Sequence, residues 1–155
     1  WRRQGAYRRR SDVNFVLDAS VTMCWILRDG KTAERAYALE VLNLMKLSET
    51  SAVVPVTWGL EVANAIGKAE MKGLVREAQS EAFLEMLDGV DIRADAATFS
   101  RALSDTLQIA RRYRLSSYDA SYLELAMRAG LPLATLDRDL RTAAGKAGVA
   151  RFAAG

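Results

Sequence analysis

Histidine is absent from all 155 residues of the chain. This absence excludes catalysis by Ser-His-Asp or Cys-His groups, the usual zinc sites, and acid–base chemistry by imidazole. If the chain is an enzyme, carboxylates and a hard metal ion are the natural catalytic groups that remain.

Cysteine and long apolar runs are almost as scarce. The single cysteine, Cys24, excludes an intramolecular disulfide bond, and its apolar neighbours predict a small buried residue. The longest apolar stretches, such as Val21–Leu27, are far shorter than the roughly 20 residues that a membrane-spanning helix needs. No apolar segment of the signal-peptide type follows the basic N-terminus. We therefore expect a cytoplasmic protein that does not bind a membrane.

Excess positive charge is lacking outside the N-terminus. Residues 1–12 hold five arginines and one acid, so residues 13–155 contain 17 basic and 18 acidic residues although the whole chain carries +3. Bulk charge therefore does not indicate a nucleic-acid-binding domain, although the N-terminal arginines could bind RNA non-specifically. With little apolar content and no periodicity, residues 1–12 are predicted to be a disordered extension, a cloning remnant or the product of an upstream start.

Short apolar runs alternate with longer helical patterns over residues 13–155, a length that suits one domain. The predicted strands are residues 14–18, 52–54, 90–93 and 131–135, with 149–152 as the candidate for a fifth. The predicted helices are residues 20–27, 32–47, 57–72, 75–87, 96–113, 118–129 and 137–147. Short buried strands separated by helices require crossover connections. We therefore predict an α/β fold with a mostly parallel sheet of four or five strands and helices on both faces.

The clearest amphipathic pattern lies in residues 96–113. Its apolar positions follow the 3.6-residue helical period, which predicts that they face the core together. These positions are Phe99, Ala102, Leu103, Thr106, Ile109, Ala110 and Tyr113.

Four acidic residues, which we call the acidic quartet, are predicted at the carboxyl edge of the sheet, where sites form in parallel α/β folds. They are Asp18, Glu61, Asp119 and Asp137. Asp18 and Asp137 follow the first and fourth predicted strands, and the other two lie near the starts of helices. Clustered carboxylates repel one another, and a divalent cation such as Mg²⁺ or Mn²⁺ resolves this repulsion. Such an ion can activate water and stabilise charge on a phosphodiester, so the set predicts phosphodiester hydrolysis without histidine.

Each of these acids also has a structural interpretation. Asp18 favours function, because an unpaired acid that closes an apolar strand is costly to bury. Asp119 is equally consistent with a capping box on Ser116, and Asp137 taken alone favours a helix N-cap. Glu61 taken alone favours a solvated acid. The functional hypothesis therefore rests on the set.

Four segments together resemble the PIN domain and, within that group, the bacterial VapC-type toxins. They are residues 14–20 (NFVLDAS), 55–64 (PVTWGLEVAN), 115–126 (LSSYDASYLELA) and 133–140 (LATLDRDL). The third and fourth in tandem are quite specific, and the resemblance covers residues 14–152. It places the start of the family pattern near Val13, so that residues 13–155 would form a PIN domain.

The resemblance implies an endoribonuclease that depends on Mg²⁺ or Mn²⁺, has an RNA substrate and a cognate antitoxin protein, and usually forms a homodimer. By position, Asp18, Glu61, Asp119 and Asp137 match the family's metal-binding and catalytic acids. Ser20 and Asn64 match frequent supporting polar positions, although Asn64 taken alone favours an ordinary surface amide. A PIN-fold nuclease with a non-toxin role in RNA processing and a non-catalytic PIN binding module are the alternatives within the family.

Two further features have open interpretations. Residues 32–47 are apolar over more than one helical stripe, which predicts a groove for an antitoxin helix, a dimer face, or a helix buried on two sides. Arg111, Arg112 and Arg114 precede Asp119, and they could either hold RNA phosphates or serve the end of a helix.

Two other α/β classes fit less well. A phosphoaspartyl phosphatase usually has a second acid two residues after its nucleophile, where this chain has Ser20. A phosphoacceptor receiver domain usually has adjacent acids at the end of its first strand, but here Ala19 follows Asp18. It also has a lysine after its last strand, and residues 149–155 contain no lysine.

Overall fold

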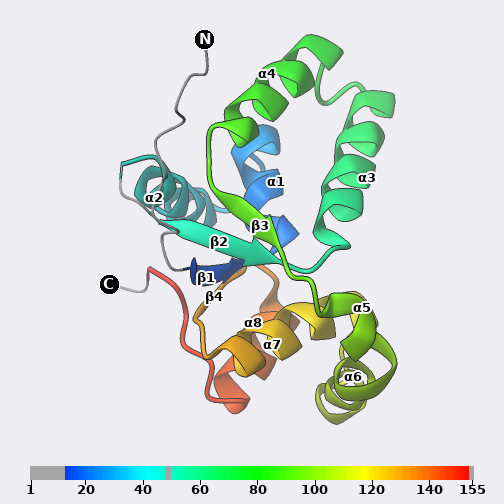
Figure 1. Cartoon of the computed structure of the whole chain (residues 1–155). Helices are drawn as coiled ribbons and strands as arrows, with labels where there is room; N and C mark the ends of the chain where they lie inside the picture. The colour runs from blue at the N-terminus through cyan, green and yellow to red at the C-terminus, as the bar shows by residue number, and fades with distance from the viewer. Residues whose placement is uncertain (1–12, 48–49, 154–155) are drawn as a thin grey trace, which may run out of the picture.

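The computed structural model describes residues 13–47 and 50–153, so the predicted N-terminal extension lies outside the described residues. The described chain contains a four-stranded sheet in the order β3-β2-β1-β4 (Figure 1), and all three strand pairings are parallel. The strands are β1 (Val13–Leu17), β2 (Ser51–Val54), β3 (Ile92–Ala94) and β4 (Leu133–Ala134). The predicted parallel sheet is thus confirmed.

Helices cover both faces of this sheet. Figure 1 shows α1 (Ala19–Leu27), α2 (Thr32–Leu47), α3 (Trp58–Met71) and α4 (Glu77–Asp88) on one side, and α7 (Ser117–Ala129) and α8 (Arg138–Lys146) on the other. Consecutive residues of β1 point to opposite faces. Phe15 and Leu17 pack with α1 and α2, whereas Val16 packs with α7 and α8. This two-sided burial explains why the first strand is a continuous apolar run.

The predicted helix over 96–113 is broken into three pieces. It consists of α5 (Thr98–Arg101), the π-helical segment η1 (Ala102–Thr106) and α6 (Leu107–Tyr113). A π-helical turn contains more residues than an α-helical turn, so it rotates the residues before it relative to those after it. The prediction that Phe99 and Leu103 face the core is wrong, because they are 89% and 90% exposed. Thr106 and Ala110 are buried as predicted.

The candidate fifth strand does not form as a strand within the described residues. It is reduced to a single parallel bridge between Leu133 and Arg151. The segment is nevertheless held in place, since the Phe152 N–H donates to the Leu133 carbonyl at 3.0 Å and the Phe152 ring stacks on Phe15. The sheet therefore has four strands and a C-terminal segment that follows β4.

Helix α2 buries one face and exposes the other. Tyr37, Ala38 and Val41 are among its buried residues, whereas Leu39 and Leu47 are 56% and 87% exposed. The helix is therefore not buried on two sides in the single chain. The cysteine is buried as predicted. Across the described residues, no helix combines the length and the apolar character needed to span a membrane.

Candidate active site at the carboxyl edge of the sheet

Asp18 is the most buried member of the acidic quartet. It links β1 to α1, it is 4% exposed, and its Oδ2 accepts hydrogen bonds from Ser20 Oγ at 2.5 Å and Thr135 Oγ1 at 2.7 Å. Within the described residues both of these side-chain bonds end on Oδ2, so Oδ1 remains available to a ligand. Burial raises the pKa of Asp18 to about 6 against the opposing effect of the two hydroxyls, and the nearby charges of Asp119 and Asp137 raise it further.

Glu61 lies in the first turn of α3, close enough to Asp18 for the two charges to interact. The Tyr122 hydroxyl of α7 donates to Glu61 Oε1 at 3.1 Å, which connects the two faces of the sheet. Burial raises the pKa of Glu61, the Tyr122 hydrogen bond opposes this shift, and the charges of Asp18 and Asp119 add to it. Glu61, which taken alone favoured a solvated acid, is half-buried and hydrogen-bonded in the structure.

Asp119 and Asp137 lie at the N-termini of α7 and α8. The Asp119 backbone N–H donates to Ser116 Oγ at 3.1 Å, and Asp137 Oδ1 accepts from the Leu140 N–H at 2.7 Å. The N-cap interpretation of Asp137 is thus confirmed. Burial raises the pKa of Asp119, and the neighbouring charge of Asp137 raises it further. Asp137 therefore caps a helix and also belongs to the electrostatic cluster.

Two hydroxyls hold this edge of the sheet together. Ser20 Oγ accepts from the Leu136 N–H at 2.9 Å, and Thr135 Oγ1 accepts from the Asp137 N–H at 3.0 Å, while both donate to Asp18. They therefore tie the end of β1 to the segment after β4. Ser20 was predicted as a supporting residue. Asn64 is exposed, and within the described residues its side chain makes no hydrogen bond, so its supporting role stays a prediction.

Sequence reasoning missed Thr135 and Tyr122. The available sequence signal was that Thr135 is the one polar residue in the run from Leu133 to Leu136. In the structure Thr135 is 2% exposed. Tyr122 follows Asp119 by three residues and therefore lies on the same side of α7. Burial raises the pKa of the Tyr122 phenol, and the charges of Asp18 and Glu61 raise it further, so it remains a hydrogen-bond donor.

The donor chemistry of the acidic quartet fits a hard divalent cation. All four side chains offer carboxylate oxygens, which such ions prefer. Among the described residues, the ion pairs of the chain involve other acids, so no cationic side chain offsets the repulsion within the quartet. Within the same residues, no three His, Cys, Asp or Glu side chains are gathered closely enough to hold a metal ion as they stand. A shared cation would therefore have to draw the carboxylates together.

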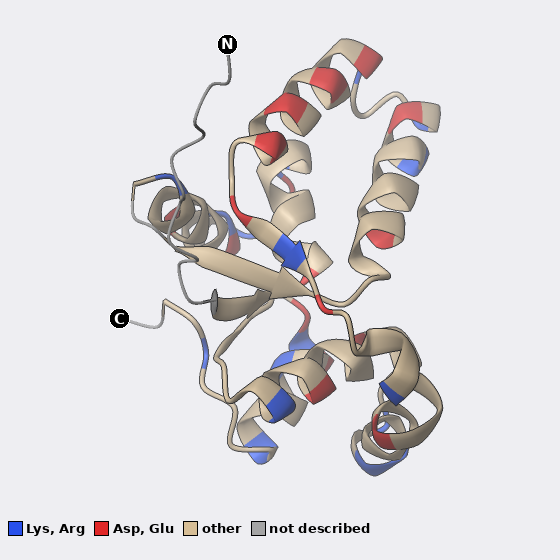
Figure 2. Cartoon of the chain, viewed as in Figure 1, with Lys and Arg blue, Asp and Glu red and all other residues tan. Residues whose placement is uncertain are grey.

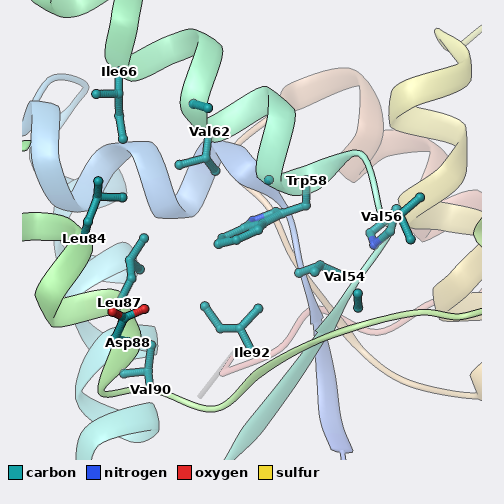
Figure 3. A pocket seen from close by; sticks show the side chains of 14 residues that line it. Val54, Val56, Trp58, Val62, Ile66, Leu84, Leu87, Asp88, Val90 and Ile92 are labelled. Carbon is teal, nitrogen blue, oxygen red and sulfur yellow. The ribbon is translucent and has the colours of Figure 1, made fainter.

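Other acidic and concave features are less suited to hydrolysis. Figure 2 shows a row of acids along α4, namely Glu77, Glu81, Glu85 and Asp88, all of them exposed. A pocket of about 660 Å³ lies between α3, α4 and the ends of β2 and β3. Figure 3 shows its mainly apolar walls, with Trp58, Val62 and Ile92, and Asp88 is the one acid in the lining. One carboxylate among apolar walls does not provide the set that a metal ion needs.

The sequence matches the PIN domain family model over residues 15–146. It is 33% identical over 130 residues to Ribonuclease VapC3 of Mycobacterium tuberculosis, a match that covers 83% of this chain and 85% of that protein. It is also 35% identical over 80 residues to Ribonuclease VapC3 of Pyrobaculum aerophilum. That second match covers 52% of this chain and 61% of the relative, so it spans less than two thirds of the relative's length.

A solved structure shares the architecture. The crystal structure of PAE2754 from Pyrobaculum aerophilum superimposes with a TM-score of 0.62 at 26% sequence identity. The superposition covers 84% of this chain and 86% of that one.

Proposed function

Because this chain belongs to the PIN-domain family, we propose that it is a metal-dependent endoribonuclease and the toxin of a toxin–antitoxin pair. The observation that carries the proposal is the buried Asp18, surrounded by acids that no cationic side chain of the described residues neutralises. Two relatives named Ribonuclease VapC3 support RNA as the substrate class.

The proposed cofactor is Mg²⁺, with Mn²⁺ as its substitute. Asp18, Asp119 and Glu61 would hold the ion directly or through water, and Asp137 would complete the site or hold a second ion. When bound, such an ion supplies an activated water nucleophile and offsets the charge that develops on the phosphodiester. Hydrolysis by attack at phosphorus would leave a 3′-hydroxyl and a 5′-phosphate.

The residues of the chain would hold these acids in fixed positions. Ser20 and Thr135 bind Oδ2 of Asp18 and leave Oδ1 for the ion. Tyr122 holds Oε1 of Glu61, and the cap bond to Leu140 fixes Asp137. Such supports matter because phosphoryl transfer depends mainly on positioning and electrostatics.

Two protein partners belong to the proposal. The name VapC of the relatives supports a cognate antitoxin, and the family resemblance supports a homodimer. The exposed leucines of α2, Leu39, Leu44 and Leu47, are apolar side chains on a mixed face where a protein partner could pack. The molecular mass of the chain in solution, measured with and without the antitoxin, would show whether the antitoxin or a second copy covers these leucines.

Cleavage of defined RNAs by the purified full chain tests the enzyme directly. The reactions would contain Mg²⁺, Mn²⁺ or EDTA, with Asp119→Asn as the site variant and Glu81→Gln, an exposed acid on α4, as the matched control. We expect cleavage that needs the metal, persists in Glu81→Gln and disappears in Asp119→Asn. Equal cleavage by Asp119→Asn would contradict the site, and no cleavage under any condition would favour a non-catalytic binding module.

A further inference from the structure

We propose that a second pocket, beside the acidic quartet, binds backbone phosphates of the RNA next to the bond that is cleaved. This inference rests on the function proposed above. The pocket has a volume of about 640 Å³ and lies between the end of α6 and one face of α8. Its polar lining consists of Arg112, Arg114, Asp139, Thr142 and Lys146.

Positive charge dominates the pocket. Three cations, Arg112, Arg114 and Lys146, face a single acid, Asp139. None of the three takes part in an ion pair among the residues that the structure describes. Arginine guanidinium groups bind phosphate oxygens in pairs and lysine adds a mobile charge, so this lining suits a phosphodiester backbone.

The position of the pocket connects it to the acidic quartet. Asp137 caps the N-terminus of α8, and the same helix then presents Asp139, Thr142 and Lys146 at helical spacing along one face. Asp139 is close enough to Asp119 for its charge to be felt there. The face from Asp139 to Lys146 extends over roughly 10 Å of helix. A pocket with three cations therefore adjoins the helix whose N-terminus carries a member of the quartet.

Helix-end electrostatics alone do not account for this arrangement. Cations are favoured in the last turn of any helix, and both Arg111 and Arg112 lie in the last turn of α6. Of these two arginines, only Arg112 lines the pocket. Arg114 ends α6 in the left-handed conformation with φ 55°, a position that glycine adopts more easily, so helix termination does not require arginine there.

RNA binding by full-chain variants tests the pocket. All variants would carry Asp119→Asn, and binding of a fluorescent single-stranded RNA would be measured in EDTA over a range of salt concentrations. We expect the triple variant Arg112→Gln, Arg114→Gln, Lys146→Gln to bind at least tenfold more weakly. We also expect its salt dependence to fall by about 2 in log–log slope, since each phosphate contact on a single strand contributes roughly 0.7.

Two controls separate this effect from general charge loss. Arg111→Gln removes a cation from the same helix end outside the pocket, and the triple variant Lys68→Gln, Lys72→Gln, Arg76→Gln removes three exposed cations near the turn between α3 and α4. Both should bind nearly as tightly as the parent. The variant Arg112→Lys, Arg114→Lys should keep most of the affinity, which guards against loss of folding as the cause.

The outcomes are distinguishable from those for the proposed function. Unchanged binding and slope in the pocket variant, or an equal loss in either control, would overturn the pocket while leaving metal-dependent cleavage intact. Pocket-dependent binding without any metal-dependent cleavage by the wild-type chain would overturn the ribonuclease and keep the phosphate site. A chain that binds no RNA at all would overturn both.

Discussion

Two groups of buried and half-buried acids in this molecule have opposite electrostatic surroundings. Asp95 and Glu124 share Arg128, whose guanidinium lies 2.7 Å from Asp95 Oδ2 and 2.8 Å from Glu124 Oε1. Although burial opposes it, the hydrogen bonds from Arg128 lower the pKa of Asp95. Among the described residues, the side chains of the acidic quartet accept hydrogen bonds from hydroxyls and, at Asp137, from a backbone N–H, but they have no cationic partner. The pKa values of Asp18, Glu61 and Asp119 are raised.

The difference separates a cluster that stabilises the fold from the cluster that we propose as the active site. An arginine neutralises the charge of a buried acid within the protein itself. A set of unpaired acids instead destabilises the folded state by mutual repulsion until a cation binds. Within the part of the chain that the structure describes, Asp95 has that counter-charge in Arg128 and Asp18 has none. We attribute the omission to a metal ion that would occupy the second site.

The largest expected difference between the clusters is in activity. Asp18→Asn should lower RNA cleavage by about 10²–10³-fold or more, because it removes a group that stabilises transition-state charge through the metal. Asp95→Asn should retain most of the activity, because Asp95 pairs with Arg128 away from the quartet. Initial rates on one RNA at saturating Mg²⁺ would measure both. Similar losses in the two variants would show that the contrast is not functional.

The next largest effect is on the free energy of unfolding. Arg128→Met should destabilise the fold by about 2–3 kcal/mol, since it leaves Asp95 and Glu124 without their partner at 11% and 5% side-chain exposure. Denaturant unfolding near neutral pH gives this value, with the exposed Arg76→Met as control. A change below about 0.5 kcal/mol, the size expected for an exposed pair, would mean that Arg128 contributes no more than a surface cation.

The pH dependence of the free energy of unfolding should show the destabilising effect of the ionised Asp18. Its pKa of about 6 in the folded chain lies above the ordinary value of 3.8, so the folded state holds the proton more tightly. Without metal, Asp18 is protonated in both the folded and the unfolded state below pH about 4, so it does not affect the free energy of unfolding there. As the pH rises to about 6, ionisation of Asp18 destabilises the folded state by up to about 3 kcal/mol. The difference between wild type and Asp18→Asn over this range isolates the effect, and a constant difference would contradict it.

The smallest expected effect belongs to an exposed ion pair. Arg101 and Asp105 lie four residues apart, with 44% and 52% of their side chains exposed. Arg101→Gln should therefore change the free energy of unfolding by less than about 0.5 kcal/mol. The same denaturant titration serves as the measurement. A loss as large as that of Arg128→Met would show that burial is not what distinguishes these pairs.

The sequence predicted features that depend on local rules. A carboxylate directly after an apolar strand placed Asp18 at the sheet edge, and an acid before a helical pattern placed Asp137 at an N-cap, as observed. The periodicity of the chain also predicted the parallel sheet with helices on both faces. These inferences succeed because strand ends and helix caps are determined within a few residues.

Features that depend on distant contacts or on rare helix geometry could not be predicted. The hydrogen bonds of Thr135 to Asp18 and of Tyr122 to Glu61 join residues 117 and 61 positions apart, so no local pattern contains them. The period of residues 96–113 gave no sign of the π-helical segment η1, which turns Phe99 and Leu103 to the surface. A 3.6-residue period assumes an unbroken α-helix, and here that assumption fails.

The most direct test of the central claim is thermal unfolding of the wild-type chain during titration with Mn²⁺ near neutral pH. If the quartet lacks only a counter-charge, Tm should rise and saturate, with a stabilisation of about 2.7 kcal/mol at a hundredfold excess over Kd. The double variant Asp18→Asn, Asp119→Asn should show no such rise. Equal responses of wild type and variant, or no response of the wild type, would contradict a metal site at the acidic quartet.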